Sequence, residues 1–306
     1  MSATFRVFLN ETAGSATGDE QLADIVAAFA DAGAEASAEH IPPDELGAGM
    51  RAAAERGETV VVAGGDGTIN TAAAVAVNDG ITLGVLPLGT FNHFAKDLGV
   101  PTELAEAAEF LVAAVPTAVD VGEVNERVFV NNASIGVYPR MVDERDELRT
   151  TRGWGKIRAT LLAGWSTLRN PPRDRLRVAL DGRPAELHET SLLFVGNGLY
   201  DDGGRDVGTR TSLSAGVLGV YEIEAASRWR LLTEAVRTKL RGLHAADHTH
   251  RWSVAELRID ADERRLAIAL DGEPTEMEPP LRFACRPGAL TVLGAPTTED
   301  VPVSQS

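Results

Sequence analysis

Two strand–glycine–helix junctions follow one another closely, and they constrain the fold more than any other feature of the chain. The first is VVVAGGDGTIN at residues 60–70, and the second is VLPLGTFNHFAKDLG at residues 85–99. In each, an apolar run without alternation predicts a strand buried on both faces, and the glycines predict a tight turn into a helix. Strands that alternate with helices indicate a parallel sheet covered on both faces.

Both junctions lie at the carboxyl ends of their strands, which is the edge where open α/β sheets bind ligands. Helix N-termini there offer free N–H groups and a dipole that favours an anion such as phosphate. We expect Thr68 and Asn70 to begin the first helix and Thr90 to cap the second. The candidate residues for binding a phosphate-bearing ligand in these junctions are Gly64, Gly65, Asp66, Gly67, Thr68, Asn70, Gly89, Thr90 and Asn92.

Asp66 is an unusual residue for a simple phosphate loop, because its charge would repel the anion. A metal ion that bridges Asp66 and the phosphate would remove this conflict. The loop is not a Walker P-loop, since no lysine follows and the spacing differs. A glycine-rich turn without a ligand is the alternative for either junction alone, and the presence of two such junctions makes it much less favourable.

The pattern changes near Ala118. Short strand-like runs follow at spacings of about 10–20 residues, separated by Asp-Gly and Asn-Gly turns, which predicts a mainly antiparallel β-sandwich. We therefore expect an α/β domain at 1–120, a β-rich domain at 121–295 and a loose tail at 296–306.

Charge excludes one class of function. The chain has 45 acidic and 29 basic residues, and 18 of the acidic but only four of the basic ones lie in residues 1–120. Such acidity argues against nucleic acid as a partner, because phosphate neutralisation needs clustered Lys and Arg. The single cysteine, Cys285, the absence of a signal-like N-terminus and the absence of a long apolar window predict a soluble, cytoplasmic protein.

Two basic stretches, 145–177 and 228–243, interleave Arg and Lys with Trp and Leu at helical spacing. One interpretation is peripheral contact with anionic lipid at the inner face of the membrane. The other is an ordinary amphipathic helix that packs on the β domain. We give both the same weight.

GGDGTIN at 64–70 and PLGTFNHFAKDLG at 87–99 resemble motifs of the diacylglycerol kinase catalytic-domain family, which includes soluble bacterial lipid kinases and sphingosine kinases. The resemblance extends over essentially the whole chain, to Asn10 and Gly14, residues 119–136, FVGNG at 194–198 and LDGEP at 270–274. It implies a three-layer α/β domain that binds ATP, followed by an all-β domain, with the active site in the cleft between them.

The resemblance also implies roles. Asn10, Gly14, residues 64–70 and Thr90 would bind ATP, Asp66 would support Mg²⁺-ATP, and Asp120 would join the magnesium–water network. Asp271 or Glu273 would take the proton from a lipid hydroxyl, and Glu273 is favoured. Without the resemblance, LDGEP would be interpreted as a plain hairpin turn, as LDGRP at 180–184 illustrates.

The function that this resemblance implies is transfer of the ATP γ-phosphate to a membrane lipid, either diacylglycerol or a sphingoid-like alcohol. One alternative is a kinase of a soluble substrate related to NAD kinase or phosphofructokinase, which also use GGDG loops. Another is a catalytically silent nucleotide- or lipid-binding regulator, suggested by Ala215 at a position where the family commonly has a metal-binding Asp. No pattern indicates a particular lipid or an oligomeric state.

Overall fold

The computed structural model describes residues 4–10, 18–137, 139, 173–200, 210, 212–224 and 249–295. The chain forms two compact units, one of Met1–Asp120 with Gly288–Ser306 and one of Val121–Pro287. It therefore returns to the first unit at Gly288, whereas the sequence patterns group 121–295 together. The reason is the long strand β15 (Leu281–Gly294), whose end pairs in parallel with β4 (Leu83–Pro87) through Val292 and Leu83.

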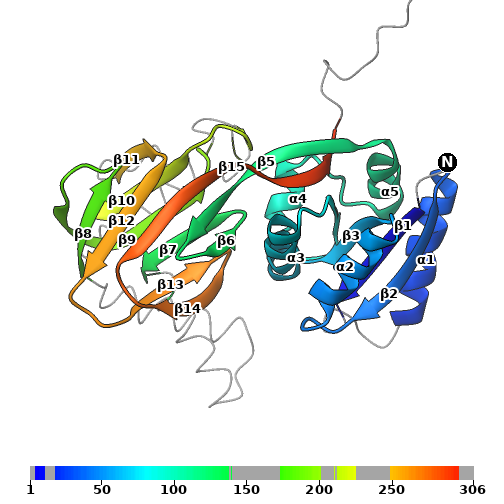
Figure 1. Ribbon diagram of the computed structural model, residues 1–306, viewed down its shortest axis with the longest axis horizontal. Coiled ribbons are helices and arrows are strands. Elements are labelled where there is room, and N and C mark those ends of the chain that lie inside the picture. Colours follow the sequence, from blue (N-terminus) through cyan, green and yellow to red (C-terminus); the bar gives the residue numbers. More distant parts are fainter. Residues whose placement is uncertain are drawn as a thin grey trace, which may run out of the picture. The chain divides into compact units, whose positions relative to one another are not determined.

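The first unit is an α/β domain built on a parallel sheet with the order β2-β1-β3-β4-β15 (Figure 1). Its remaining strands are β1 (Thr4–Asn10), β2 (Glu35–Ile41) and β3 (Thr59–Gly64). Strands β3 and β4 are buried almost throughout, as expected for strands with helices on both faces. This confirms the α/β architecture predicted for the first half of the chain.

Five helices accompany the described part of this sheet: α1 (Gly18–Asp31), α2 (Leu46–Glu55), α3 (Asp66–Asp79), α4 (His93–Asp97) and α5 (Leu104–Ala113). Helix α1 packs against α5, and α2 packs against α3. The helices bury one apolar stripe each, such as Ile25 and Phe29 of α1, and the ring of Phe29 lies 5.0 Å from that of Phe5 in the sheet.

Two helix starts differ from the sequence-based expectation. Helix α3 begins at Asp66, not at Thr68 or Asn70, because the extended backbone of Gly65 already forms the N-cap position. Thr90 is not the cap of α4, since the chain first passes through Asn92 in the left-handed conformation (φ 52°) and the helix begins at His93. Strand β2 was not predicted, because EASAEHI has few β-branched residues.

The second unit is an antiparallel β-sandwich, as predicted. Its strands follow the order β14-β13-β7-β9-β8-β12-β15, with β10 and β11 added beside β9, and β5 and β6 beside β15. The bounds are β5 (Val115–Val124), β6 (Arg127–Phe129), β7 (Asn132–Gly136), β8 (Asp174–Leu180), β9 (Glu186–Asn197), β10 (Leu218–Glu224), β11 (Thr249–Val254), β12 (Glu256–Ala261), β13 (Leu266–Leu270) and β14 (Glu273–Met277).

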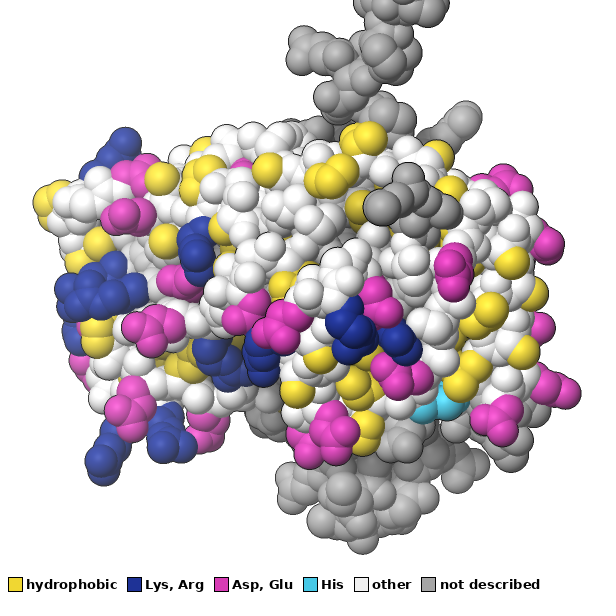
Figure 2. Space-filling model, turned by 45° about the vertical axis from the view of Figure 1, so that its right-hand side comes forward, with side chains coloured by type: hydrophobic (Ala, Val, Ile, Leu, Met, Phe, Trp, Pro, Cys, Tyr) yellow, Lys and Arg dark blue, Asp and Glu magenta, His cyan; other side chains and the backbone are white. Residues whose placement is uncertain are grey.

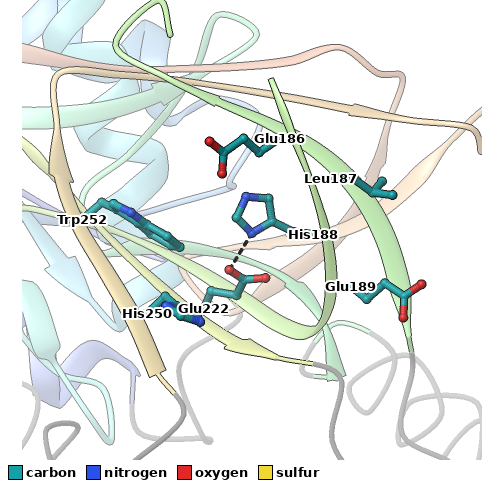
Figure 3. A pocket seen from close by; sticks show the side chains of 7 residues that line it. All are labelled: Glu186, Leu187, His188, Glu189, Glu222, His250 and Trp252. Carbon is teal, nitrogen blue, oxygen red and sulfur yellow. Dashed lines mark hydrogen bonds and ion pairs between the residues drawn. The ribbon is translucent and has the colours of Figure 1, made fainter. Parts of the chain in front are cut away.

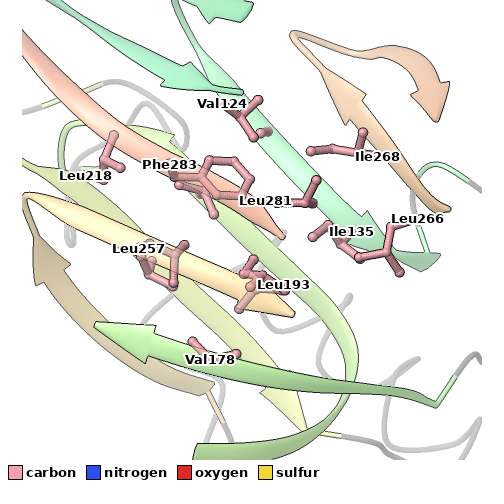
Figure 4. Packing of buried hydrophobic residues seen from close by; sticks show 14 of the residues in the cluster. Val124, Ile135, Val178, Leu193, Leu218, Leu257, Leu266, Ile268, Leu281 and Phe283 are labelled. Carbon is pink, nitrogen blue, oxygen red and sulfur yellow. The ribbon is translucent and has the colours of Figure 1, made fainter. Parts of the chain in front are cut away.

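An apolar cluster fills the described part of this unit (Figure 4). The rings of Phe129 and Phe283 meet edge to face with centroids 6.3 Å apart, and both side chains are buried. Gly122 faces Phe129 across the β5–β6 pair, and a Cβ at Gly122 would lie only 2.1 Å from the ring. The glycine therefore leaves the space that lets this aromatic residue enter the core.

On the surface of the second unit, arginines alternate with acids. Ion pairs join Arg175 to Glu189 and Arg177 to Asp262, and the face drawn in Figure 2 shows basic and acidic side chains beside one another. Within the described residues, no helix is both long and apolar enough to cross a bilayer. The basic stretches at 145–172 and 228–243 lie outside the described residues.

Candidate functional site

The carboxyl edge of the parallel sheet gathers most of the residues that the junctions predicted. Asn10 ends β1, Gly64 ends β3, and Leu88 and Gly89 follow β4. The Asn10 side chain donates a hydrogen bond from Nδ2 to Oγ1 of Thr68 at 3.0 Å, which joins the end of β1 to the first turn of α3. Gly14 lies outside the described residues.

The two glycine-rich loops pack directly on each other. A Cβ at Gly89 would lie 2.5 Å from the Cα atom of Gly65, and a Cβ at Gly64 would lie 2.8 Å from the side chain of Thr68. Gly65 and Gly89 therefore allow the two loops to approach each other, and Gly64 leaves room for Thr68 within its own loop, in addition to any role toward a ligand. Thr90 is exposed beside them.

Asp66 joins the same two loops through its carboxylate. Oδ2 accepts the N–H of Asn92 at 3.1 Å, and Oδ1 accepts the N–H of His93 at 2.8 Å. The Asn92 side chain bonds both the N–H and the carbonyl of Gly89, each at 2.9 Å. Asp66 and Asn92 thus fix the shape of the second loop, and the exposed ring of Phe91 stacks on His93 above it.

The donor set at this edge fits a phosphate and a divalent cation. Gly65 at the N-cap of α3 has no side chain to cap the helix, and no described side chain does so, which favours binding of an anion by its first N–H groups. The Oδ1 atom of Asn70 is buried and has no hydrogen-bond partner in the part of the chain that the structure describes. Each oxygen of Asp66 retains a lone pair beyond its backbone bond, and Mg²⁺ commonly needs only one or two carboxylates when phosphates and waters complete its shell.

Asp120, the other acid predicted to act near the metal, bonds the backbone at the end of the first unit. Its Oδ1 accepts the N–H of Gly288 at 2.9 Å, where the chain re-enters the first unit. Among the described residues, no group of three or more His, Cys, Asp or Glu side chains has the arrangement of a metal site. A cation here would depend on a bound ligand for most of its coordination.

Asp271 occupies a second site, in the second unit. Its Oδ1 accepts the N–H groups of Asn131 at 2.8 Å and Asn132 at 2.9 Å, and its Oδ2 accepts that of Val130 at 2.9 Å. The side chain is only 9% exposed. Burial raises the pKa of Asp271 to about 6, although the three N–H groups and the charge of Arg210 oppose this rise.

The sequence did not single out the residues that hold the other side of this segment. Arg210 and the Nδ2 atom of Asn197 both donate to the carbonyl of Val130, and the Tyr200 hydroxyl donates to the carbonyl of Asn131. Asn197 lies in the FVGNG motif, which was a usable signal, whereas nothing in the sequence pointed to Arg210 or Tyr200. Segment 130–132 is therefore bonded on both its N–H and its carbonyl side.

Glu273 is two residues from Asp271 but has different surroundings. Its side chain is exposed, and it forms no hydrogen bond or ion pair with the described residues. The related turn LDGRP has the same backbone shape, with φ values of 46° at Asp181 and 70° at Gly182 against 48° and 87° at Asp271 and Gly272. Both turns thus place Asp and Gly in the left-handed region. They differ in what surrounds them and in the connection they belong to, because β14 begins directly after Gly272 whereas β9 begins only at Glu186.

Another polar cavity, of about 500 Å³, opens on strands β9, β10 and β11 (Figure 3). The buried carboxylate of Glu222 bonds Nδ1 of His188 at 2.8 Å, and the ring of His250 stacks on Trp252. None of the residues predicted for nucleotide binding or proton transfer lines this cavity. The His188–Glu222 pair satisfies the buried carboxylate internally.

Comparison with known proteins gives a consistent result. Residues 4–124 match the diacylglycerol kinase catalytic domain, and residues 134–294 match the YegS C-terminal NAD kinase beta sandwich-like domain. A diacylglycerol kinase of Bacillus subtilis is 29% identical over 90% of this chain and 91% of its own length. A Pseudomonas aeruginosa protein named "Probable lipid kinase YegS-like" is 31% identical over 94% of this chain and 95% of its own length.

Solved structures show the same fold. A crystal structure of a diacylglycerol kinase from Bacillus anthracis has a TM-score of 0.67 at 19% identity, and covers 96% of this chain and 97% of its own. A second crystal structure from that organism has a TM-score of 0.74 at 23% identity, with coverages of 96% and 98%.

Proposed function

The chain belongs to the diacylglycerol kinase catalytic-domain family, in its YegS-like branch, and from this premise we propose that it transfers the γ-phosphate of ATP to a hydroxyl group of a membrane lipid. The observation that carries the proposal is the bonding of Asp66 to both N–H groups of the Asn92–His93 turn, which joins two glycine-rich loops at one sheet edge. Phosphoryl transfer depends mainly on positioning and on charge neutralisation, and this edge supports both.

In this proposal the first unit binds the nucleotide. The first N–H groups of α3 would donate hydrogen bonds to phosphate oxygens, and Asn10, Thr68 and Asn70 would line the loop beside them. Mg²⁺ would be held by Asp66 with the phosphates, and Asp120 would contribute through water. Bound Mg²⁺ would neutralise charge that develops on the phosphoryl group.

The second unit would supply the general base that accepts the proton of the lipid hydroxyl. Glu273 is an exposed carboxylate without a protein partner among the described residues, so it is available to accept the proton of a lipid hydroxyl. We accordingly assign the general base to Glu273. We also propose that the two units correspond to a nucleotide-binding and a lipid-binding domain.

The test uses the full chain with γ-labelled ATP, Mg²⁺ and a lipid extract in mixed micelles. We expect label in a chloroform-soluble product, and loss of that label in Asp66→Ala and Glu273→Ala. Label on NAD or a sugar phosphate would instead support a kinase of a soluble substrate. Binding of ATP or lipid without turnover on any substrate would support a silent regulator.

Lipid preference requires a second experiment, with diacylglycerol and a sphingoid base supplied separately. Peripheral membrane contact is tested with vesicles of defined composition. Association that increases with anionic lipid and decreases in salt is the expected result, because both follow from electrostatic attraction to the headgroups. Association that responds to neither would refute the membrane contact, without bearing on the kinase reaction.

A further inference from the structure

We propose that Asp271 is a positioning residue in this reaction: it fixes the backbone of residues 130–132 and the turn that carries Glu273, and it does not itself take the proton. This inference rests on the proposed function. It assigns a separate role to each acid of the LDGEP turn.

The hydrogen bonds of Asp271 are the first argument. An ionised carboxylate offers about four lone-pair sites, and backbone N–H groups of Val130, Asn131 and Asn132 use three of them. A general base must come within about 2.6–3.2 Å of the substrate hydroxyl. Asp271 is only 9% exposed, whereas the Glu273 side chain is exposed and unbonded within the described chain.

The second argument is the LDGRP turn, which has the same construction. The Asp181 carboxylate accepts the N–H groups of Ala255 at 2.9 Å and Glu256 at 3.0 Å, at the start of β12. The backbone N–H of Asp181 donates to the carbonyl of Glu256 at 3.0 Å. Asp271 repeats this at the start of β7, where its N–H donates to the carbonyl of Asn132 at 2.8 Å. In both turns the Asp carboxylate accepts backbone N–H groups at the start of a neighbouring strand and the Asp N–H donates to a carbonyl of that strand; we call this arrangement the clamp. The LDGRP turn has it without carrying a residue proposed for catalysis.

The clamp has a consequence for Glu273. Asp271 binds segment 130–132 through both its carboxylate and its backbone N–H, while Arg210, Asn197 and Tyr200 hold the carbonyl side of that segment. Glu273 begins β14 two residues after Asp271 and pairs with Leu270 across the turn. Removing the carboxylate would therefore loosen both segment 130–132 and the carboxylate proposed as the base.

The test compares Asp271→Asn and Asp271→Ala with the matched variants Asp181→Asn and Asp181→Ala, all in the full chain. Asparagine tolerates the left-handed conformation and keeps one side-chain acceptor oxygen, whereas alanine keeps no side-chain acceptor and only the backbone N–H bond to Asn132. Amide exchange of the peptide covering 130–132 should accelerate about 100-fold in Asp271→Ala and about 10-fold in Asp271→Asn.

Lipid phosphorylation provides the second readout. We expect kcat to fall about 100-fold in Asp271→Ala but only about 10-fold in Asp271→Asn, with the KM for ATP unchanged. If kcat is measured against pH, it should still decrease toward acidic pH in Asp271→Asn, because the proposed base, Glu273, is still present. We refer to this decrease as the acidic limb of the profile. Both Asp181 variants should retain the kcat of the unmodified chain.

Two results would overturn the inference. The first is equal inactivity of Asp271→Asn and Asp271→Ala together with loss of the acidic limb, which is the behaviour of a base. The second is unchanged exchange at 130–132 in Asp271→Ala, which would exclude the clamp whatever the activity. If the unmodified chain phosphorylates no lipid, the proposed function fails, while the exchange measurement still decides whether the clamp exists.

Discussion

The turns LDGRP at 180–184 and LDGEP at 270–274 have the same backbone conformation and the same type of clamp, but they differ in depth. Asp181 is exposed and accepts two backbone N–H groups, whereas Asp271 is buried and accepts three. The following side chain is Arg183 in one turn and Glu273 in the other. Asp-Gly thus adopts left-handed φ values in both turns, whereas burial and the side chain after the glycine distinguish them.

Burial also makes the ionised form of Asp271 less favourable than that of the exposed Asp181. A buried carboxylate must replace its lost hydration by hydrogen bonds, and the raised pKa of Asp271 shows that its three bonds do so incompletely. Asp181 keeps contact with water.

The side chain after the glycine should produce the largest difference. Glu273→Gln should lower kcat about 1,000-fold, because a positioned general base contributes roughly 10²- to 10⁴-fold. Arg183→Gln should leave kcat unchanged. Initial rates of lipid phosphorylation at saturating ATP measure both, and a Glu273→Gln variant that keeps more than a tenth of the activity would contradict the assignment of the base.

Removal of each clamping carboxylate should affect stability unequally. Asp271→Ala leaves three N–H groups without acceptors, two of them buried and one partly buried, and should cost about 3 kcal/mol. In Asp181→Ala the two released N–H groups can bond water instead, so the cost should be about 1 kcal/mol. Urea unfolding followed by Trp fluorescence measures the free energy of unfolding. Equal losses in the two variants would show that burial does not distinguish the turns.

The pH dependence of stability should reveal the raised pKa of Asp271. Between about pH 4 and 6, the folded chain keeps a proton on Asp271 that the unfolded chain has released, so the stability contributed by this group falls as pH rises. The loss should be on the order of 2 kcal/mol. It is measured as the difference between the unmodified chain and Asp271→Asn.

The control for the range from pH 4 to 6 is Asp181→Asn. This variant retains Asp271, so its stability should depend on pH as that of the unmodified chain does. A difference curve for Asp271→Asn that is flat from pH 4 to 6 would exclude a raised pKa in the folded state.

The smallest effect concerns the glycine of the shallower turn. Gly182 has φ 70°, and a Cβ there would meet nothing within 4 Å, so Gly182→Ala adds only the cost of the left-handed conformation, about 1 kcal/mol. We expect a decrease in Tm of about 2–4 °C and an unchanged kcat. A loss of activity would mean that this turn also contributes to the reaction.

The sequence predicted the parallel sheet, the β-sandwich and the clustering of the glycine-rich loops, because each depends on local periodicity or on strand ends. Asp66 and Gly89 could be predicted as site residues because each lies in a glycine-rich loop directly after a strand. The clamp of Asp271 could not be predicted, since its acceptor bonds join residues about 140 positions apart. The same distance problem hid Arg210, which lies 80 positions from Val130.

Other differences had local causes. Strand β2 has a weak strand composition, and its pairing with β1 over seven residues stabilises it instead. The beginning of α3 at Asp66 depends on the extended backbone of Gly65, and sequence alone could not distinguish that conformation from a turn.

The pairing of β15 with β4 has a consequence for synthesis of the protein. Strand β4 lies between β3 and the last strand of the chain, so the first unit lacks one edge of its sheet until Val292 has been made. At translation rates of about 5–20 residues per second, that edge waits roughly 10–40 s after residue 87. We therefore expect the nascent N-terminal unit to depend on chaperones during this interval, and a chain ending at Pro287 to keep that exposed edge permanently.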